Sequence, residues 1–229
     1  MKDDRVALIT GARRGIGRAI AHRLQVDGWK LSLGLRDGLQ DWGLDPAVQT
    51  VAYDAAQGGE DKWVATALDR FGRIDAVIAN AGIMIPKSVV EIDDEDLEAM
   101  WAVNVRAPQR LARAAFPALE KSGKGRVVII ASLSGKRVAS VQSSAYAMTK
   151  HAAVALAHGL RQAGFDQGIR ATAICPGFVS SDMGKSLMPD MDTMTTPAEI
   201  ADVVAMAIDL PNRASVAEIA VNCRAEQSY

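Results

Sequence analysis

Short apolar segments alternate with longer amphipathic segments along this chain. The short segments have the length and composition of strands, and the longer ones repeat apolar residues at helical spacing. Strands are predicted at 6–10, 30–35, 48–53, 76–79, 126–131, 171–175 and 216–221. Helices are predicted at 15–27, 60–71, 94–120, 145–163 and 197–210. Such alternation predicts βαβ units that share one parallel sheet.

The 229 residues are a suitable length for one large domain with a sizeable core. The stretch 127–130 is apolar throughout, which is typical of a strand covered on both faces. No linker, repeat or low-complexity segment divides the chain. We therefore predict a single α/β domain over 1–229, a Rossmann-like doubly wound parallel sheet of about seven strands with helices on both faces.

Composition and charge exclude several classes of function. Hydrophobic residues make up 49% of the chain, and the formal net charge is -1. This balance gives no electrostatic attraction to nucleic acid or to an anionic membrane, so neither is an expected partner. No apolar run approaches the ~20 residues that span a bilayer, and the first residues do not resemble a secretory signal. Cys175 and Cys223 are two isolated cysteines without the spacing of metal ligands, so we expect no disulfide framework and no metal site. A reducing cytoplasm is therefore the expected location.

A glycine-rich loop, TGARRGIG, joins the first predicted strand to the first predicted helix. Glycine permits positive φ and close approach to the backbone, and the following helix offers unpaired N–H groups to an anion. We expect Gly11 to form the turn, Gly15 to allow the approach and Gly17 to pack the helix on the strand. The alternative is an ordinary tight connection. The residues predicted to bind a pyrophosphate are Thr10, Gly11, Arg13, Arg14, Gly15, Ile16 and Gly17.

Tyr146 and Lys150 lie four residues apart in a predicted helix, so their side chains share one face. A tyrosine of ordinary pKa, ~10, is a poor acid or base at neutral pH. A neighbouring ammonium lowers that pKa, and we expect this effect to prepare Tyr146 for proton transfer. The alternative is a chance surface pair.

These motifs together resemble the short-chain dehydrogenase/reductase family, in the right order from residue 5 to about 220. The matching segments are TGARRGIG, Asn80-Ala81-Gly82, Asn104, Ser132, Tyr146 with Lys150, and Pro176-Gly177. The resemblance implies an NADPH-dependent oxidoreductase that transfers a hydride between nicotinamide and a small carbonyl or alcohol substrate. A regulatory or sensor protein that binds NADP(H) with little turnover is the alternative.

The resemblance also implies four catalytic residues. Tyr146 would exchange a proton with the substrate oxygen, and Ser132 would hydrogen-bond that oxygen. Lys150 would lower the tyrosine pKa and bind the nicotinamide ribose, and Asn104 would hold a water. Ser132 precedes Tyr146 by fourteen residues, one more than the family pattern, so Ser134 remains a rival.

Residues near the adenosine ribose favour NADP over NAD. The position that is acidic in NAD-preferring relatives is Leu35, and Arg36 follows it. With Arg14, Arg36 would bind a 2′-phosphate through paired guanidinium contacts. The alternatives are that both arginines are solvated, or that Asp37 occupies the acidic position in a shifted register.

Further contacts follow from the resemblance. Asp54 and Ala55 are expected at the adenine, although Asp54 fits a turn equally well. Asn80 is expected to hold neighbouring backbone around the cofactor. The other residues assigned to the cofactor are Ala81, Gly82, Pro176, Gly177, Val179 and Ser181.

Two expectations concern the substrate and the assembly. A methionine-rich substrate lid is expected at about 182–195, where ordinary packing on the core is the alternative. Apart from two histidines, the helix that follows Lys150 has no ionisable side chain before Arg161. An uncharged helix is often buried on both faces, which favours a homodimer or homotetramer.

Overall fold

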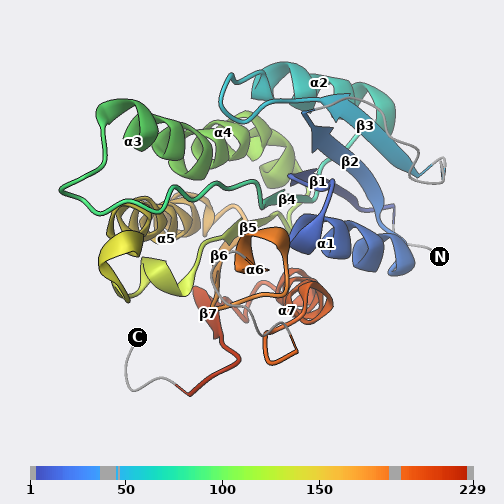
Figure 1. Cartoon of the computed structure of the whole chain (residues 1–229). Coiled ribbons are helices and arrows are strands. Elements are labelled where there is room, and N and C mark those ends of the chain that lie inside the picture. The colour runs from blue at the N-terminus through green and yellow to red at the C-terminus, as the bar shows by residue number, and fades with distance from the viewer. Residues whose placement is uncertain (1–3, 37–44, 46, 186–191, 226–229) are drawn as a thin grey trace.

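One parallel sheet forms the centre of the molecule (Figure 1). The computed structural model describes residues 4–36, 45, 47–185 and 192–225. Within these ranges the seven strands have the order β3-β2-β1-β4-β5-β6-β7, and every neighbouring pair is parallel. The strands are β1 (Val6–Thr10), β2 (Lys30–Leu35), β3 (Val48–Ala52), β4 (Ala76–Ala79), β5 (Arg126–Ile130), β6 (Arg170–Pro176) and β7 (Glu218–Val221).

Helices cover both faces of the sheet, as the alternating pattern predicted (Figure 1). One face carries α1 (Gly15–Val26) and α7 (Pro197–Asp209), which pack side by side. The opposite face carries α2 (Glu60–Phe71), α4 (Ala107–Lys121) and α5 (Ser144–Gly164). The predicted doubly wound α/β fold is therefore confirmed.

Each face of the sheet has its own apolar core. Ile20 and Leu24 of α1 pack with Val204 of α7 over the side chains of β1 and β2. On the other face, Trp63 of α2 packs over β2, and Leu111 belongs to α4, which packs over β4 and β5. The central strands contribute side chains to both cores, which explains why their sequences are almost continuously apolar.

The predicted strands and helices agree with the structure to within two residues at each end, except in one region. A helix was predicted over 94–120, and the chain is helical from Asp94 to Lys121, but a change of helix type in its middle was not predicted. The segment contains α3 (Asp94–Trp101), a π-helical turn at Ala102–Arg106 and then α4. Asp93 caps the start of α3 by accepting a hydrogen bond from the Asp96 amide at 2.9 Å. Three short elements were also not predicted: Leu133–Gly135, Val141–Ser143 and α6 (Asp182–Lys185).

The strand order brings distant motifs to one edge of the sheet. The chain crosses over between β1 and β4, which lie side by side although two strands separate them in sequence. In open parallel sheets, ligands bind beyond the carboxyl ends of the strands at such a switch point. The loops that follow β1, β4, β5 and β6 all open onto this edge.

Among the described residues, no helix has the length and apolar character needed to cross a bilayer.

Candidate active site

The glycine loop has the backbone conformation that its sequence predicted. Gly11 has φ of 65° and Gly15 has φ of 55°, in the left-handed region that favours glycine. A Cβ atom on Gly17 would overlap the carbonyl oxygen of Gly11 and the side-chain amide of Asn80. Because Gly17 has no side chain, α1 can approach β1 closely.

The N-terminus of α1 offers space and donors for an anion. No side chain caps this helix at Arg14. Among the described residues, an added Cβ on Gly15 would have only the Cβ of Ser181 within 4 Å, at 3.6 Å. Open backbone at a helix N-terminus suits a phosphate group, so this loop fits the pyrophosphate of a dinucleotide.

Asn80 and Thr10 fasten β4 to the glycine loop. The Asn80 side-chain amide donates to the carbonyl oxygens of Thr10 at 3.0 Å and Gly11 at 3.2 Å. The Thr10 hydroxyl accepts from the amides of Asn80 and Ala81, both at 2.9 Å. These four bonds fix the loop against the neighbouring strand, and the Asn80 side-chain nitrogen donates to two backbone carbonyl oxygens.

Tyr146 and Ser132 meet beneath this edge of the sheet. Tyr146 lies on α5, and Ser132 follows β5. Burial raises the pKa of Tyr146 above its ordinary value, and a hydrogen bond with Ser132 acts in the opposite direction. The Ser132 hydroxyl also accepts from the Ser134 amide at 3.1 Å. The structure thus places Ser132, rather than its rival Ser134, beside the phenol.

Lys150 is buried one helical turn beyond Tyr146. Its ammonium donates to the carbonyl oxygen of Ile130 at 3.0 Å and lies 5.6 Å from the centre of the Tyr146 ring. Burial lowers the pKa of Lys150 to about 8. Lys150 was expected to lower the pKa of Tyr146, but in the polypeptide by itself burial sets the direction of the shift. The desolvation of a phenol packed among apolar side chains dominates.

Asn104 occupies the middle of the π-helical turn and is buried. Its side-chain amide accepts from the Ile83 amide at 2.9 Å and donates to the Ile83 carbonyl oxygen at 2.9 Å and to Thr149 Oγ1 at 3.0 Å. An added Cβ on Gly82 would lie 3.3 Å from Asn104 Oδ1 and 3.4 Å from Lys150 Nζ. Asn104, Lys150 and the loop after β4 therefore face one small space.

Thr149 is a member of this network that sequence reasoning missed. Its hydroxyl donates to the Tyr146 carbonyl oxygen at 2.8 Å and accepts from Asn104. A threonine next to Lys150 gives no signal in the sequence, because its partner lies 45 residues earlier in the chain.

The two arginines assigned to the 2′-phosphate are both exposed near the glycine loop. Arg36 lies in a turn directly after β2, and Leu35 before it is buried. Arg14 forms an ion pair with Asp182 of α6 at 2.8 Å, which the sequence did not predict. Asp37, the possible competitor, lies outside the described residues.

The turn after β3 is held by polar contacts of its own. The Asp54 carboxylate accepts from the Ala56 amide at 2.9 Å, which is the turn role considered for it. The Ala55 carbonyl oxygen accepts from the Arg110 guanidinium at 2.9 Å, and Arg110 also pairs with Glu60 at 3.0 Å. This support comes from α4 and α2, so sequence proximity did not indicate it.

The segment after β6 is pinned to β7 and folds back toward the glycine loop. The Gly177 amide donates to the Val221 carbonyl oxygen at 2.7 Å, and the Ser181 amide donates to the Val179 carbonyl oxygen at 2.7 Å. Residues 186–191, the middle of the expected lid at 182–195, lie outside the described residues. Of the lid methionines described, Met194 is buried and Met183 is exposed.

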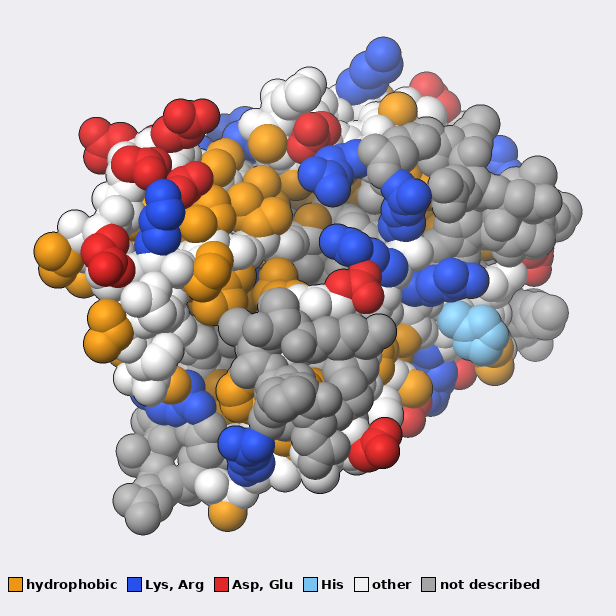
Figure 2. Space-filling view, viewed as in Figure 1, with side chains coloured by type: hydrophobic (Ala, Val, Ile, Leu, Met, Phe, Trp, Pro, Cys, Tyr) orange, Lys and Arg blue, Asp and Glu red, His pale blue; other side chains and the backbone are white. Residues whose placement is uncertain are grey.

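The surface above this edge divides by residue type. Figure 2 shows Lys and Arg side chains gathered near α1, and hydrophobic side chains gathered toward α3 and α5. The basic part of this surface suits the anionic phosphates of a dinucleotide, and the hydrophobic part suits an uncharged substrate. In the part of the chain that the structure describes, no cluster of three or more His, Cys, Asp or Glu side chains could hold a metal ion.

Known proteins resemble this chain in sequence and in fold. A family profile for short chain dehydrogenases matches residues 5–192. Agropine synthesis reductase of Rhizobium rhizogenes is 40% identical over 233 aligned residues, which cover 98% of this chain and 54% of the reductase. The chain therefore spans about half the length of that relative.

Two solved structures share the fold over almost the whole chain. One is an alcohol dehydrogenase from Thermococcus sibiricus complexed with 5-hydroxy-NADP, with a TM-score of 0.85 and 30% identity over 97% of this chain and 99% of the other. The second is a short chain dehydrogenase from Burkholderia cenocepacia in complex with NADP, with a TM-score of 0.86 and 25% identity over 97% and 98%.

Proposed function

This chain belongs to the short-chain dehydrogenase family, and we propose that it is an NADPH-dependent oxidoreductase that interconverts a small carbonyl compound and its alcohol. One observation carries the proposal: Tyr146, Ser132 and Lys150 gather at the sheet edge onto which the glycine loop opens. A protein that only bound a dinucleotide would not need a buried phenol and ammonium at this place.

The cofactor, when bound, supplies the hydride. The glycine loop and the open N-terminus of α1 fit its pyrophosphate, with Asn80 holding the loop in position. Asp54 and Ala55 fit the adenine side. Ala81, Gly82, Pro176, Gly177, Val179 and Ser181 fit the nicotinamide side.

Tyr146 acts as the general acid when the carbonyl compound is reduced. The phenol is protonated at neutral pH, so a proton is available for the substrate oxygen, although the raised pKa makes Tyr146 a weaker acid than an exposed tyrosine. Ser132 donates a hydrogen bond to the same oxygen and fixes its position. The Lys150 ammonium stabilises the phenolate that remains after the proton has left. Asn104 and Lys150 both face the space beside Gly82, where a water would return a proton to the site.

The 2′-phosphate of NADPH is recognised by Arg14 and Arg36. The nearby end of β2 is occupied by buried Leu35, so no carboxylate at that position repels the phosphate. The ion pair with Asp182 already orients the Arg14 guanidinium. When the 2′-phosphate takes the place of the Asp182 carboxylate, the positive charge of Arg14 stays paired. The two solved relatives complexed with NADP-type cofactors support this preference.

The proposal also covers the assembly and the location of the protein. Met148, Ala155 and Gly159 lie one helical turn or two apart on the exposed face of α5, and none of them is charged. We infer that this face packs against a second copy, giving a homodimer or homotetramer. Cys175 and Cys223 are both free thiols, which suits a reducing cytoplasm.

Tyr146→Phe tests the function. The variant removes only the hydroxyl group, so NADPH affinity should stay within about twofold while turnover falls by about 100-fold or more. The measurement is NADPH oxidation with a panel of ketones and aldehydes, together with NADPH binding by fluorescence. Turnover at the parent rate would remove Tyr146 as the proton donor. A parent enzyme that binds NADPH but turns over none of the panel would favour the sensor alternative.

A further inference from the structure

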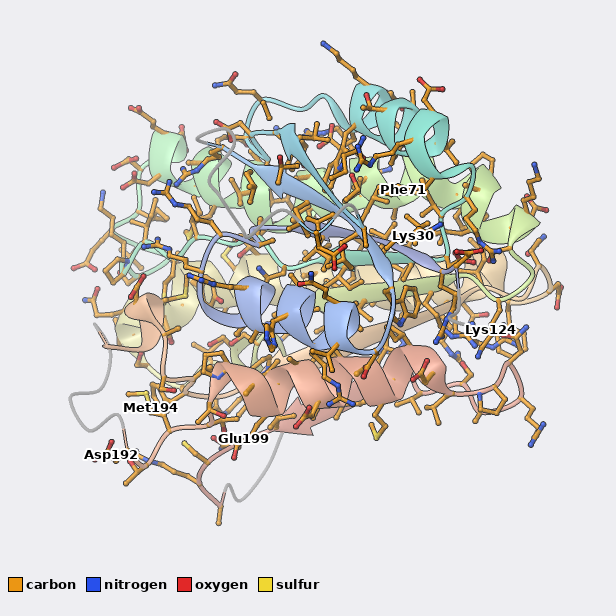
Figure 3. The ribbon with its side chains drawn as sticks, turned by 90° about the vertical axis from the view of Figure 1, so that its right-hand side faces the viewer. Lys30, Phe71, Lys124, Asp192, Met194 and Glu199 are labelled. Carbon is orange, nitrogen blue, oxygen red and sulfur yellow. The ribbon has the colours of Figure 1, made fainter. Side chains whose placement is uncertain are left out.

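A second hollow lies at the amino-terminal edge of the sheet, opposite the glycine loop. Its volume is about 240 Å³, the space of roughly eight water molecules at about 30 Å³ each. We call it the basal hollow. Residues just before or at the start of β1, β2, β4 and β5 line it, among them Arg5, Trp29, Arg73, Asp75, Lys124 and Arg126. In Figure 3, Lys124 and Lys30 mark this end of the molecule, and Met194 marks the opposite end.

Two buried donors at this hollow lack an acceptor. Within the described ranges, the indole Nε1 of Trp29 and the guanidinium Nε of Arg126 have no hydrogen-bond partner. Trp29 is 2% exposed and Arg126 is 3% exposed, so bulk water does not serve either group. Buried donors in folded proteins are nearly always paired. Both residues line the hollow, so a ligand with acceptor oxygens that drew either side chain toward the hollow would pair its donor.

Some of the positive charge in the basal hollow is already neutralised. Arg73 forms a bidentate pair with Asp75, at 2.9 and 2.7 Å. Arg5 pairs with Asp209 at 2.7 Å, and its guanidinium stacks 4.2 Å from the centre of the Trp29 ring. These contacts hold the walls of the hollow and orient the indole.

The remaining positive charge is not paired with carboxylates. Lys124 donates to the main-chain carbonyl oxygen of Asp209 at 3.3 Å. Arg126 donates to the carbonyl oxygens of Gly125 at 2.9 Å and Leu210 at 2.6 Å, and to Asn212 Oδ1 at 3.0 Å. All of these acceptors are neutral. In the described part of the chain, neither basic side chain forms an ion pair with an acidic one.

The surroundings of Arg126 disfavour its charge. Burial lowers its pKa to about 10, and the positive charges of Arg170 and Arg5 act in the same direction. A bound anion would offset this repulsion and accept the free Nε hydrogen at the same time.

We propose that the basal hollow binds a phosphate group, either inorganic phosphate or the phosphate of a small phosphomonoester. Its oxygens accept from Trp29 Nε1 and Arg126 Nε, and Lys124 contributes its charge at the mouth. A tetrahedral oxyanion suits this arrangement because it accepts hydrogen bonds from several directions at once. The site is separate from the proposed cofactor site, since it lies at the other edge of the sheet.

Phosphate binding to the full chain tests the site. Isothermal titration with inorganic phosphate and with glycerol 3-phosphate, each against chloride at equal ionic strength, should show saturable binding of at least one of them. Tighter binding of inorganic phosphate indicates a free ion as the ligand, and tighter binding of the ester indicates a phosphomonoester. Saturable binding of neither would overturn the proposal.

Matched variants assign the binding to the basal hollow. Lys124→Ala should weaken phosphate binding by about tenfold, and Trp29→Phe by roughly fivefold. Lys124 is exposed, so its substitution leaves the fold intact even if Trp29→Phe does not. Lys121→Ala removes an exposed lysine of α4 outside the hollow and should leave the affinity unchanged.

Filling the proposed cofactor site excludes it as the source of the binding. Phosphate titrated into protein already saturated with NADP⁺ should bind with unchanged affinity, because the basal hollow lies at the opposite edge of the sheet. If NADP⁺ abolishes phosphate binding while Lys124→Ala and Trp29→Phe preserve it, the basal hollow is not the site. That result would leave the proposed enzymatic function untouched.

Discussion

Lys150 places a charge in the core, and replacing it should make the protein more stable and less active. Its side chain is 4% exposed, and its ammonium donates to the carbonyl oxygen of Ile130 at 3.0 Å. Methionine is unbranched, like lysine, and carries no charge. We therefore expect Lys150→Met to unfold at higher urea concentration than the parent at pH 7 while its turnover is lost.

The expected magnitude follows from the pKa of Lys150. Burial lowers this pKa from 10.5 to about 8. At about 1.4 kcal/mol per pKa unit, holding the charge in the folded state at pH 7 costs about 3 kcal/mol. Removing the ammonium also removes its hydrogen bond to Ile130, which contributes about 1 kcal/mol. The net gain in the free energy of unfolding is about 2 kcal/mol.

The gain should depend on pH. Between pH 8 and pH 10.5 the unfolded chain holds a proton on Lys150 that the folded chain has released. Stability rises with pH wherever the unfolded state binds more protons, so the parent recovers stability through this window. The variant lacks the group, and its advantage should shrink from about 2 kcal/mol at pH 7 to under about 1 kcal/mol at pH 9.5.

Urea unfolding followed by circular dichroism at both pH values measures this difference. Lys121→Met is the matched control, because Lys121 is exposed and its substitution should change stability little at either pH. A Lys150→Met protein less stable than the parent at pH 7 would refute the reasoning. So would an advantage that stays the same at pH 9.5.

Three further experiments test the site. Arg14→Ala with Arg36→Ala should weaken NADPH binding by about tenfold or more and NADH binding by less than about twofold; equal losses in a fluorescence titration would contradict the phosphate assignment. Ser132→Ala should lower kcat by about 100-fold and Ser134→Ala by less than about threefold; steady-state kinetics showing the reverse order would exchange their roles. Gly17→Ala should lower stability by about 2 kcal/mol or more in urea unfolding, because its Cβ would overlap the Gly11 carbonyl, and a parent-like stability would show that α1 can shift.

The sequence predicted the sheet and its covering helices because each depends on local apolar periodicity. Strand β1, for example, begins and ends where the apolar run Val6–Thr10 does. The π-helical turn could not be predicted in this way, since its cause is a contact between distant segments. Asn104 bonds to the backbone of Ile83 with both ends of its amide, and no local pattern reports that pairing.

The candidate site shows the same division. Parallel strands bring the ends of β1, β4, β5 and β6 to one edge, so the positions of Gly11, Asn80 and Ser132 followed from the order of the motifs. The electrostatic environment of the site residues did not follow from that order. The pKa of Tyr146 depends on how completely the surrounding chain removes water from the phenol, and the ion pair of Arg14 depends on where α6 folds back.

The π-helical turn also determines what a deletion at this place would do. A π-helical turn closes each hydrogen bond over one residue more than an α-helical turn does. Losing one residue between Ala102 and Arg106 would therefore leave a regular α-helix in which Leu111 and Ala115 stay buried against the sheet. Asn104 would lose the wide turn that directs its side chain to Ile83. A single-codon deletion here would thus spare the packing of α4 and break the polar network of the site.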